Sequence, residues 1–167
     1  MGPEVLNVNI VNKFAILTVD EKSNHEYFCH KYKLSNEIRK KLKLLADEYS
    51  EFKKDKKYFE KNLEKKLFLL GKDTLNILNL LNFSEKKDTN NISANNNSRK
   101  YEKIFDKIDK MRIPKFPFNG EYLKEKGLKE GAAIGQTLKL IQNEWLSQNF
   151  NISNDRVLEI IKDKKLS

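Results

Sequence analysis

Three side chains near the start of the chain are of the kinds that bind metal ions. His25 and Cys29 stand four positions apart, which places them on one face of a helix, and His30 follows directly. A structural zinc site takes four such ligands, whereas the chain contains no further histidine or cysteine. Two histidines so close together also give no basis for a Ser-His-Asp or Cys-His-Asn set. We therefore predict that this chain has neither a metal site nor a catalytic residue.

Basic side chains toward the C-terminus could bind phosphate instead. They lie around a stretch rich in proline and glycine and comprise Lys115, Lys124, Lys126, Lys129 and Lys139. A helix is expected to begin at Gly131, and the small residues after it would leave its first N–H groups open to an anion. We therefore predict that these lysines, with Gly131 and Gly135, contact RNA. The alternative is that the two glycines allow close packing between helices.

The charge balance of the chain favours an anionic partner. Lysine and arginine together number 33 and the carboxylates 24, so the formal net charge is +9. Such a balance favours RNA, DNA or an acidic membrane surface. Only four of the basic residues are arginines, the type best suited to bidentate phosphate recognition. The abundance of Lys, Asn and Ile leaves compositional bias as the alternative explanation.

Three features of the sequence bear on the compartment. No apolar run approaches the ~20 residues needed to cross a membrane. The apolar positions between Val5 and Val19 are interrupted by asparagines and Lys13, so we expect no signal peptide. The single cysteine, Cys29, excludes an internal disulfide and fits a reducing compartment. We predict a cytoplasmic chain with no membrane partner.

The elements that would position these groups are predicted to be helices. The chain is 38% hydrophobic and 34% charged, with six glycines and three prolines, which suits a helical protein better than a β-sandwich. We predict an all-α fold, with an irregular multi-helix body and a small C-terminal helical tail domain. The helical body should span residues 1–86. A flexible linker or loop rich in Asn and Ser should occupy 87–98, and the last body helix with the tail domain 99–167.

Apolar spacing defines the body helices. Four residues recur at intervals of four, three and four and so share one helical face: Ile38, Leu42, Leu45 and Tyr49. Ser35 or Asn36 should cap that helix. Further helices are predicted over 21–32, over 52–70 with Gly71 as the left-handed residue after its end, and from 73 or 74 to 83. The range 5–19 is read as helix rather than strand, because no partner strand is visible.

Prolines and glycines in the stretch 112–150 define where the helices of the tail begin and end. Pro114 and Pro117 should keep residues 112–118 extended, and Asn119 should then form a turn or a helix cap. A short helix over 121–126 should end at Gly127. The helix that begins at Gly131 carries four apolar residues on one face: Ile134, Leu138, Ile141 and Trp145. A last helix is predicted over 155–162, capped from 153 or 154.

Five aromatic residues of the tail admit two interpretations: Phe116, Phe118, Tyr122, Trp145 and Phe150. Aromatic side chains can stack on the bases of single-stranded RNA. A small domain also needs large side chains for its core, and these are most of those available. We interpret them as core residues.

The same stretch resembles the C-terminal tail of bacterial class II tRNA nucleotidyltransferases, the CCA-adding enzymes and their poly(A) polymerase relatives. The elements that carry the resemblance are Phe116-Pro117-Phe118-Asn119-Gly120, Leu123, Gly127, Gly131-Ala132-Ala133-Ile134-Gly135, Leu138 and Trp145. Ala132 stands where the family usually has proline, which favours a helix start without being required for one. Two shorter strings, at 33–36 and 66–73, are similar to the family's body domain and precede the tail in the expected order.

The resemblance covers the non-catalytic half of the family. Its catalytic head holds two metal ions on an Asp-x-Asp motif, and its neck reads the nucleotide with Glu-Asp-x-x-Arg; neither string occurs in this chain. Asp106 and Asp109 are the closest carboxylate pair, and the lysines between and around them favour a solvated helix face. The resemblance therefore implies an RNA-binding chain that binds no cofactor itself. Mg²⁺ with CTP or ATP would belong to the complete enzyme.

The resemblance also implies partners. This chain would bind tRNA or another RNA and position it for a catalytic head and neck on a separate chain. An apolar N-terminal segment would dock that chain, or mediate self-association, through Val5, Val8, Phe14 and Leu17. From a different class, the alternative is a helical protein-interaction module or a decayed half-gene product without an RNA role.

Overall fold

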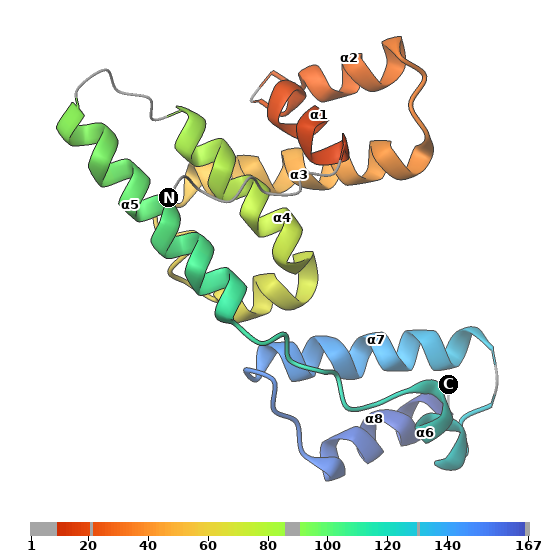
Figure 1. The fold of residues 1–167 in the computed structure, drawn as a ribbon. Helices are drawn as coiled ribbons and strands as arrows, with labels where there is room; N and C mark the ends of the chain where they lie inside the picture. Colours follow the sequence, from red (N-terminus) through yellow and green to blue (C-terminus); the bar gives the residue numbers. More distant parts are fainter. Residues whose placement is uncertain (1–9, 21, 86–90, 130, 166–167) are drawn as a thin grey trace. The chain divides into compact units, whose positions relative to one another are not determined.

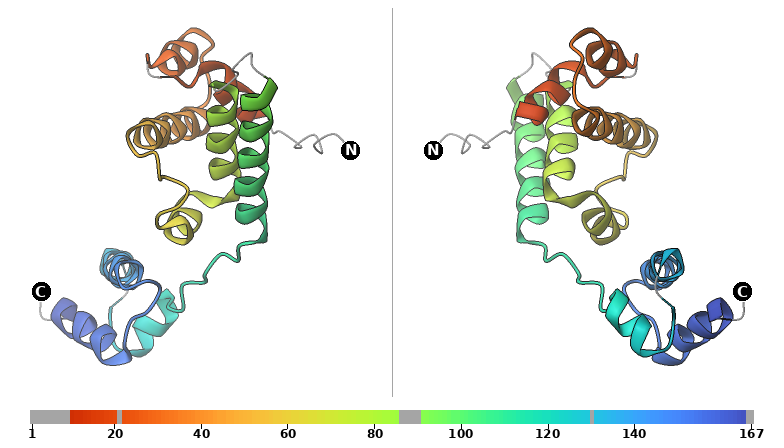
Figure 2. Two further views of the ribbon diagram at one scale, coloured as in Figure 1. Left: turned by 90° about the vertical axis from the view of Figure 1, so that its left-hand side faces the viewer. Right: turned by 90° about the vertical axis from the view of Figure 1, so that its right-hand side faces the viewer.

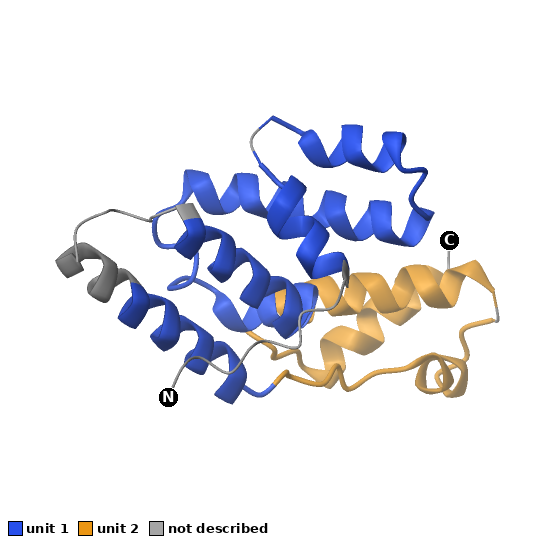
Figure 3. Ribbon diagram, turned by 45° about the horizontal axis from the view of Figure 1, so that its top comes forward, with its two compact units in different colours: residues 1–112 blue, residues 113–167 orange. Residues whose placement is uncertain are grey.

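A computed structural model of the chain describes residues 10–20, 22–85, 91–129 and 131–165. These residues form eight α-helices and, within the described ranges, no strand, so the prediction of an all-α fold is confirmed (Figure 1). The chain divides into two compact units, residues 1–112 and residues 113–167 (Figure 3). We call them unit 1 and unit 2. The boundary falls between the last helix of the predicted body and the predicted tail.

Unit 1 contains the first five helices, and unit 2 contains three. The helices of unit 1 are α1 (Ile10–Thr18), α2 (Asn24–Lys31), α3 (Asn36–Lys54), α4 (Leu63–Glu85) and α5 (Asn91–Lys110). Those of unit 2 are α6 (Gly120–Glu125), α7 (Ala132–Ser147) and α8 (Asn154–Lys165). The predicted helix over 5–19 corresponds to α1, and residues 1–9 lie outside the described part of the chain.

Helix α3 provides the floor on which α1 and α2 pack (Figure 1). Its predicted apolar face is confirmed, since Leu42, Leu45 and Tyr49 are buried and Ile38 packs against the same core. The predicted cap is also confirmed: the Ser35 hydroxyl accepts a hydrogen bond from the Ile38 N–H at 3.4 Å. One free N–H of the first turn is thereby satisfied.

Helices α4 and α5 lie side by side along most of their length (Figure 2). Each contributes a fully buried side chain to the unit 1 core, Leu78 from α4 and Ile108 from α5. A hydrogen bond also joins the two helices: the Asn79 side-chain amide of α4 donates to the Tyr101 carbonyl of α5 at 3.0 Å. Within α4, Gly71 interrupts the helical backbone. Its φ of 77° and ψ of 165° form a positive-φ conformation that glycine adopts without strain.

The predicted helix over 52–70 is wrong in its first half. Helix α3 ends at Lys54 and α4 begins only at Leu63, with turns between them. The Asp55 side chain explains the break, because its Oδ1 accepts the Lys57 N–H at 2.9 Å and so offers the backbone a turn in place of a helix. Two aromatic residues of this segment, Tyr58 and Phe59, nevertheless enter the core.

Tyr58 anchors the connection between α3 and α4. Its hydroxyl donates a 2.5 Å hydrogen bond to Glu48 Oε2, and the Lys66 amine lies 3.5 Å from the centre of its ring and donates to its carbonyl oxygen. Burial, followed by the hydrogen bond to the Glu48 carboxylate, raises the pKa of Tyr58 far above its ordinary value. Burial lowers the pKa of Lys66.

The raised pKa of Tyr58 predicts a loss of stability in alkali. Unfolding lets Tyr58 ionise above about pH 10, so its contribution is complete below that pH and is lost as the pH rises. Tyr58→Phe should lower the free energy of unfolding by about 1.5–3 kcal/mol at pH 8, and by less at pH 11. Urea unfolding followed by circular dichroism measures both values. Tyr27→Phe, at an exposed tyrosine, is the control; an equal Tyr58→Phe penalty at both pH values would contradict the assignment.

The segment predicted as a linker differs in part from the structure. Helix α5 begins at Asn91, so residues 91–98 are helical rather than a flexible loop. The remainder of the predicted linker lies among residues 86–90, outside the described residues. The polar composition of 91–98 hid the helix, because a stretch with so few apolar residues shows no apolar periodicity.

Unit 2 has a core of its own. It is built from six buried aliphatic residues of its three helices and the α6–α7 connection: Leu123, Leu128, Ile141, Val157, Ile160 and Ile161. The predicted elements are close to those observed. The Asn119 side chain caps α6 by accepting the Tyr122 N–H at 2.9 Å, Gly127 has φ 85° after the helix, and the Ser153 hydroxyl accepts the Arg156 N–H at 3.3 Å.

The aromatic residues of unit 2 pack together as predicted for a core. Trp145 is 4% exposed and meets Phe116 and Phe150 edge to face, with ring centroids 5.4 and 4.9 Å apart. Phe118 and Tyr122 pack against the aliphatic cluster and against each other. Such edge contacts add to the hydrophobic gain of burial. These rings are therefore occupied inside unit 2.

Candidate nucleic-acid interface

The five lysines predicted to bind RNA are all on the surface of unit 2: Lys115, Lys124, Lys126, Lys129 and Lys139. Lys115 lies in the extended segment before α6, Lys124 and Lys126 at the end of α6, Lys129 before α7, and Lys139 within α7. The Lys126 amine lies 5.6 Å from the centre of the Tyr122 ring, which orients that charge. All five ammonium groups belong to positions that solvent reaches.

The start of α7 is bare of side-chain bulk. Gly131 precedes the helix with φ 118°, a conformation that favours glycine, and no side chain caps the first turn. A Cβ added at Gly131 or at Gly135 would meet no atom within 4 Å. The two glycines therefore do not serve close helix packing. They leave the first turn of α7 open to a ligand. The positive φ is a further reason for glycine at position 131, but not at position 135.

Gly127 shows the contrast. It combines φ 85° with a close approach, since a Cβ there would lie 2.8 Å from the Lys165 amine at the end of α8. Because the Lys165 amine is the far end of a flexible side chain and can move aside, the positive φ is what favours glycine at this position.

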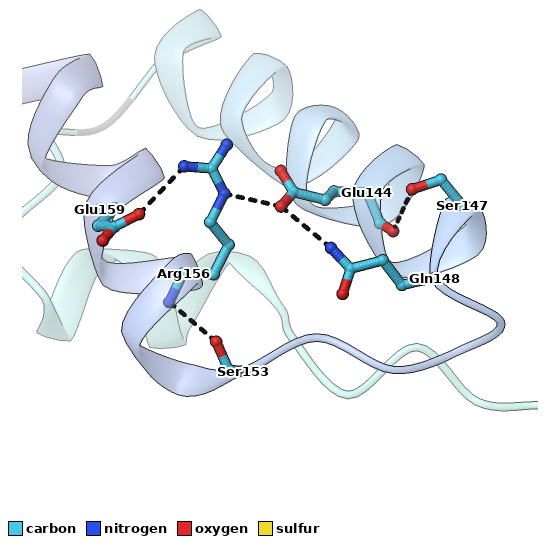
Figure 4. Close-up of polar contacts among 6 residues, drawn as sticks. All are labelled: Glu144, Ser147, Gln148, Ser153, Arg156 and Glu159. Atoms are coloured by element: carbon cyan, nitrogen blue, oxygen red, sulfur yellow. Dashed lines mark hydrogen bonds and ion pairs between the residues drawn. The ribbon is translucent and has the colours of Figure 1, made fainter.

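The arginine of unit 2 is engaged in structure rather than exposed for binding. Arg156 Nε donates to Glu144 at 2.7 Å and its Nη1 to Glu159 at 3.1 Å, so it joins α8 to α7 (Figure 4). The Glu144 carboxylate also accepts from Gln148 at 3.3 Å. The hydrogen bonds that Arg156 donates to Glu144 and then to Glu159 raise the pKa of Arg156, whose charge is thereby neutralised locally.

The predicted docking segment is described only in part. Val5 and Val8 lie outside the described residues. Phe14 is half-buried against Phe28, with ring centroids 5.2 Å apart, whereas Leu17 is 80% exposed. Tyr27 and Tyr32 on the neighbouring α2 and at its end are also exposed, at 66% and 57%. Helices α1 and α2 thus present large apolar side chains to solvent.

The fold separates His30 from the other two candidate metal ligands of α2. His25 and Cys29 face the core, while His30 is exposed. Burial raises the pKa of the Cys29 thiol, which disfavours the reactive thiolate. Across the described residues, no group of three or more His, Cys, Asp or Glu side chains is placed to hold a metal ion.

Sequence reasoning missed a basic cleft in unit 1. The cleft has a volume of about 470 Å³ and lies between the end of α3, the turn after it, α4 and α5. Five lysines line it: Lys53, Lys56, Lys100, Lys103 and Lys107. The only signal in the sequence was the spacing of the last three, which puts them on one face of a helix.

Charge is divided between two faces of α5. The cleft lysines of α5 follow the pattern i, i+3, i+7, and three carboxylates follow i, i+4, i+7 on another face: Glu102, Asp106 and Asp109. Asp106 pairs with Lys110 at 3.1 Å and Asp109 with Lys72 at 3.9 Å. Asp106 and Asp109 are thus paired with lysines that do not line the cleft. The interpretation of Asp106 and Asp109 as part of a solvated helix face agrees with these exposed contacts.

Comparison of the chain with protein-family models, with curated proteins and with solved structures finds no match. No helix within the described ranges is both long enough and apolar enough to span a membrane.

Proposed function

We propose that this chain binds RNA through the basic surface of unit 2, as the body-and-tail half of a CCA-adding enzyme or poly(A) polymerase would. The observation that supports this most directly is the start of α7. Gly131 and Gly135 leave it free of side-chain bulk without serving any packing contact, and exposed lysines precede and follow it. Backbone N–H groups at a helix start and nearby ammonium groups both favour phosphate oxygens.

The contacts proposed here would position RNA without reading its sequence. Lysine is a mobile point charge, and backbone contacts carry no direct sequence information. Trp145 is buried and the other aromatic residues of unit 2 are partly buried in contacts with one another, which limits base stacking on them. The role that follows is to hold the body of a tRNA while a separate head and neck, with Mg²⁺ and CTP or ATP, extend the 3′ end.

Titration of labelled tRNA at about 50 and about 200 mM salt tests the proposal. The wild-type chain should bind more tightly, and with a steeper salt dependence, than an unrelated protein of equal net charge. The double variant Lys129→Ala, Lys139→Ala should lower the salt slope by about 1.8, or about 0.9 per lost contact with duplex RNA. The matched control removes two exposed lysines from α3 with Lys40→Ala and Lys43→Ala. An equal effect of both variants would contradict an interface on unit 2.

Gly135 offers a test that separates binding from folding. Gly135→Ala should stabilise unit 2 by about 0.5–1 kcal/mol, since the added Cβ meets open space and alanine is the better helix former. Its tRNA affinity should stay close to wild type. Gly135→Glu places a carboxylate beside the start of α7 and should weaken tRNA binding while circular dichroism shows an intact fold. Unchanged affinity for Gly135→Glu would count against phosphate approach at this point.

The proposal includes inactivity of this chain alone. Incubation with tRNA that lacks its CCA end, with CTP, ATP and Mg²⁺, should give no nucleotide incorporation, because the chain has no Asp-x-Asp motif. Incorporation by the purified chain would refute this part of the proposal.

A second candidate function is protein interaction through α1 and α2. The exposed Leu17, Tyr27 and Tyr32 favour it, because large apolar side chains that are exposed to solvent are typical of partner sites. The same surface would suit a catalytic head chain or a second copy. Light scattering at increasing concentration, with wild type and Leu17→Glu, distinguishes these outcomes. If the wild-type chain associates and Leu17→Glu abolishes the association, this surface mediates self-association. If the chain also fails to bind tRNA at both salt concentrations, protein interaction is favoured as its main role.

A further inference from the structure

The basic cleft of unit 1 has an apolar floor beneath its lysines. Phe59 is 7% exposed, and Phe52 and Ile104 are half-buried, so these three line the cleft with carbon. The rings of Phe52 and Phe59 are 5.6 Å apart. Asn82, 8% exposed, adds an amide to the wall. The cleft therefore joins a surface for a planar apolar group to groups that can hydrogen-bond.

Four of the five cleft lysines are poorly neutralised. Among the described residues that line the cleft, Glu60 is the one carboxylate, against five lysines. Of those five, Lys56, Lys100, Lys103 and Lys107 form no ion pair with any described carboxylate. Lys53 lies over the Tyr49 ring at 5.6 Å. Like charges gathered around one concave surface repel one another, and a bound anion relieves that repulsion.

We propose that this cleft binds a nucleoside phosphate, either as a free nucleotide or as a segment of single-stranded RNA. The lysines would take the phosphates, the Phe52 and Phe59 floor would contact the base, and Asn82 could hydrogen-bond to the base edge. The volume of about 470 Å³ falls within the usual range for small-molecule sites, about 300–1,000 Å³. This site lies wholly in unit 1 and does not depend on the tail surface proposed above.

The observations favour a nucleoside phosphate over other anions. A phosphopeptide would not need an aromatic floor, and an extended membrane surface does not fit a concave site of this size. Lysine rather than arginine at all five positions indicates charge attraction rather than bidentate recognition of one fixed group. We therefore expect modest selectivity among bases.

Fluorescence anisotropy with a labelled six-nucleotide oligoadenylate RNA tests the site on the full chain. Lys103→Ala with Lys107→Ala should lower the salt slope by about 1.4, or about 0.7 per single-strand contact, which corresponds to roughly 25-fold weaker binding at 0.1 M salt. Lys40→Ala with Lys43→Ala removes the same charge from exposed positions of α3 outside the cleft and should have little effect. Equal losses in the two variants would overturn the proposal.

Further arms define the ligand and separate this site from the tail. Competition by ATP identifies free nucleotide as a ligand, and competition by an unlabelled RNA strand alone identifies single-stranded RNA. Phe52→Leu, which keeps an apolar side chain of similar size, should weaken ATP or RNA but leave competition by inorganic tripolyphosphate unchanged. If tripolyphosphate competes as well as ATP does, and Phe52→Leu changes the binding of neither ATP nor RNA, the proposed contact with the base is refuted. Lys129→Ala with Lys139→Ala should leave oligoadenylate binding intact even if tRNA binding to unit 2 fails.

Discussion

Trp145→Ala is expected to unfold unit 2. The indole is 4% exposed and contacts the Phe116 and Phe150 rings, and removing a buried tryptophan typically costs about 3–5 kcal/mol. Unit 2 spans 55 residues (113–167), for which the usual total stability is roughly 3–8 kcal/mol. The loss therefore removes most of what holds it folded.

Nuclear magnetic resonance with ¹⁵N labelling locates the damage. In Trp145→Ala the amide signals of 113–165 should collapse to the unfolded range, while those of unit 1, which has a separate core, should keep their dispersion. Trp145→Phe retains an aromatic ring and should stay folded with a smaller loss of stability. A well-dispersed spectrum of unit 2 in Trp145→Ala would contradict the central place assigned to this ring.

Ile108→Ala is expected to destabilise unit 1 by about 2–5 kcal/mol. The Ile108 side chain is fully buried within the unit 1 core, and truncation leaves a cavity that the packed helices cannot close. Ile108→Val removes one methylene and should cost about 0.5–1.5 kcal/mol. Because Ile108 anchors the helix that carries Lys103 and Lys107, oligoadenylate binding should weaken along with stability.

The single tryptophan makes this measurement specific. Trp145 lies in unit 2, so its fluorescence reports that unit, while circular dichroism reports both. In urea, Ile108→Ala should shift the dichroism transition and leave the fluorescence transition in place. A stability loss below about 1 kcal/mol would show that the site repacks, contrary to the burial of Ile108.

Local signals in the sequence predicted most of the helices. The caps at Ser35, Asn119 and Ser153 and the apolar face at Leu42 and Leu45 depend on residues within one or two turns of one another. Hydrogen bonds and apolar periodicity over so short a range can be predicted from the order of the residues. The same holds for the positive φ at Gly127.

The errors arose where local signals compete. Apolar spacing over 52–70 suggested one helix, but the Asp55 side chain captures a backbone N–H and turns the chain. Tyr58 and Phe59 then reach the core from a turn rather than from a helical face. At 91–98 a polar composition suggested a linker where α5 has begun.

The cleft could not be predicted from the sequence for a different reason. Its lysines come from the end of α3 and the turn after it, and from α5, which are brought together only by the packing of both around α4. Pattern within one helix can show that Lys100, Lys103 and Lys107 share a face. It cannot show that Phe52 and Lys56 lie opposite them. Likewise the absence of any neighbour around Gly135 is a property of the folded unit alone.

The division of charge on α5 affects how an anionic ligand approaches the protein as well as how it binds. One flank of the helix is cationic and another carries carboxylates, so the local field has a direction as well as a sign. A polyanion that diffuses toward the cationic flank is attracted and turned, whereas the flank whose carboxylates pair with Lys110 and Lys72 attracts it less. The encounter rate should therefore fall steeply with ionic strength while the dissociation rate changes less, and stopped-flow mixing would resolve the two.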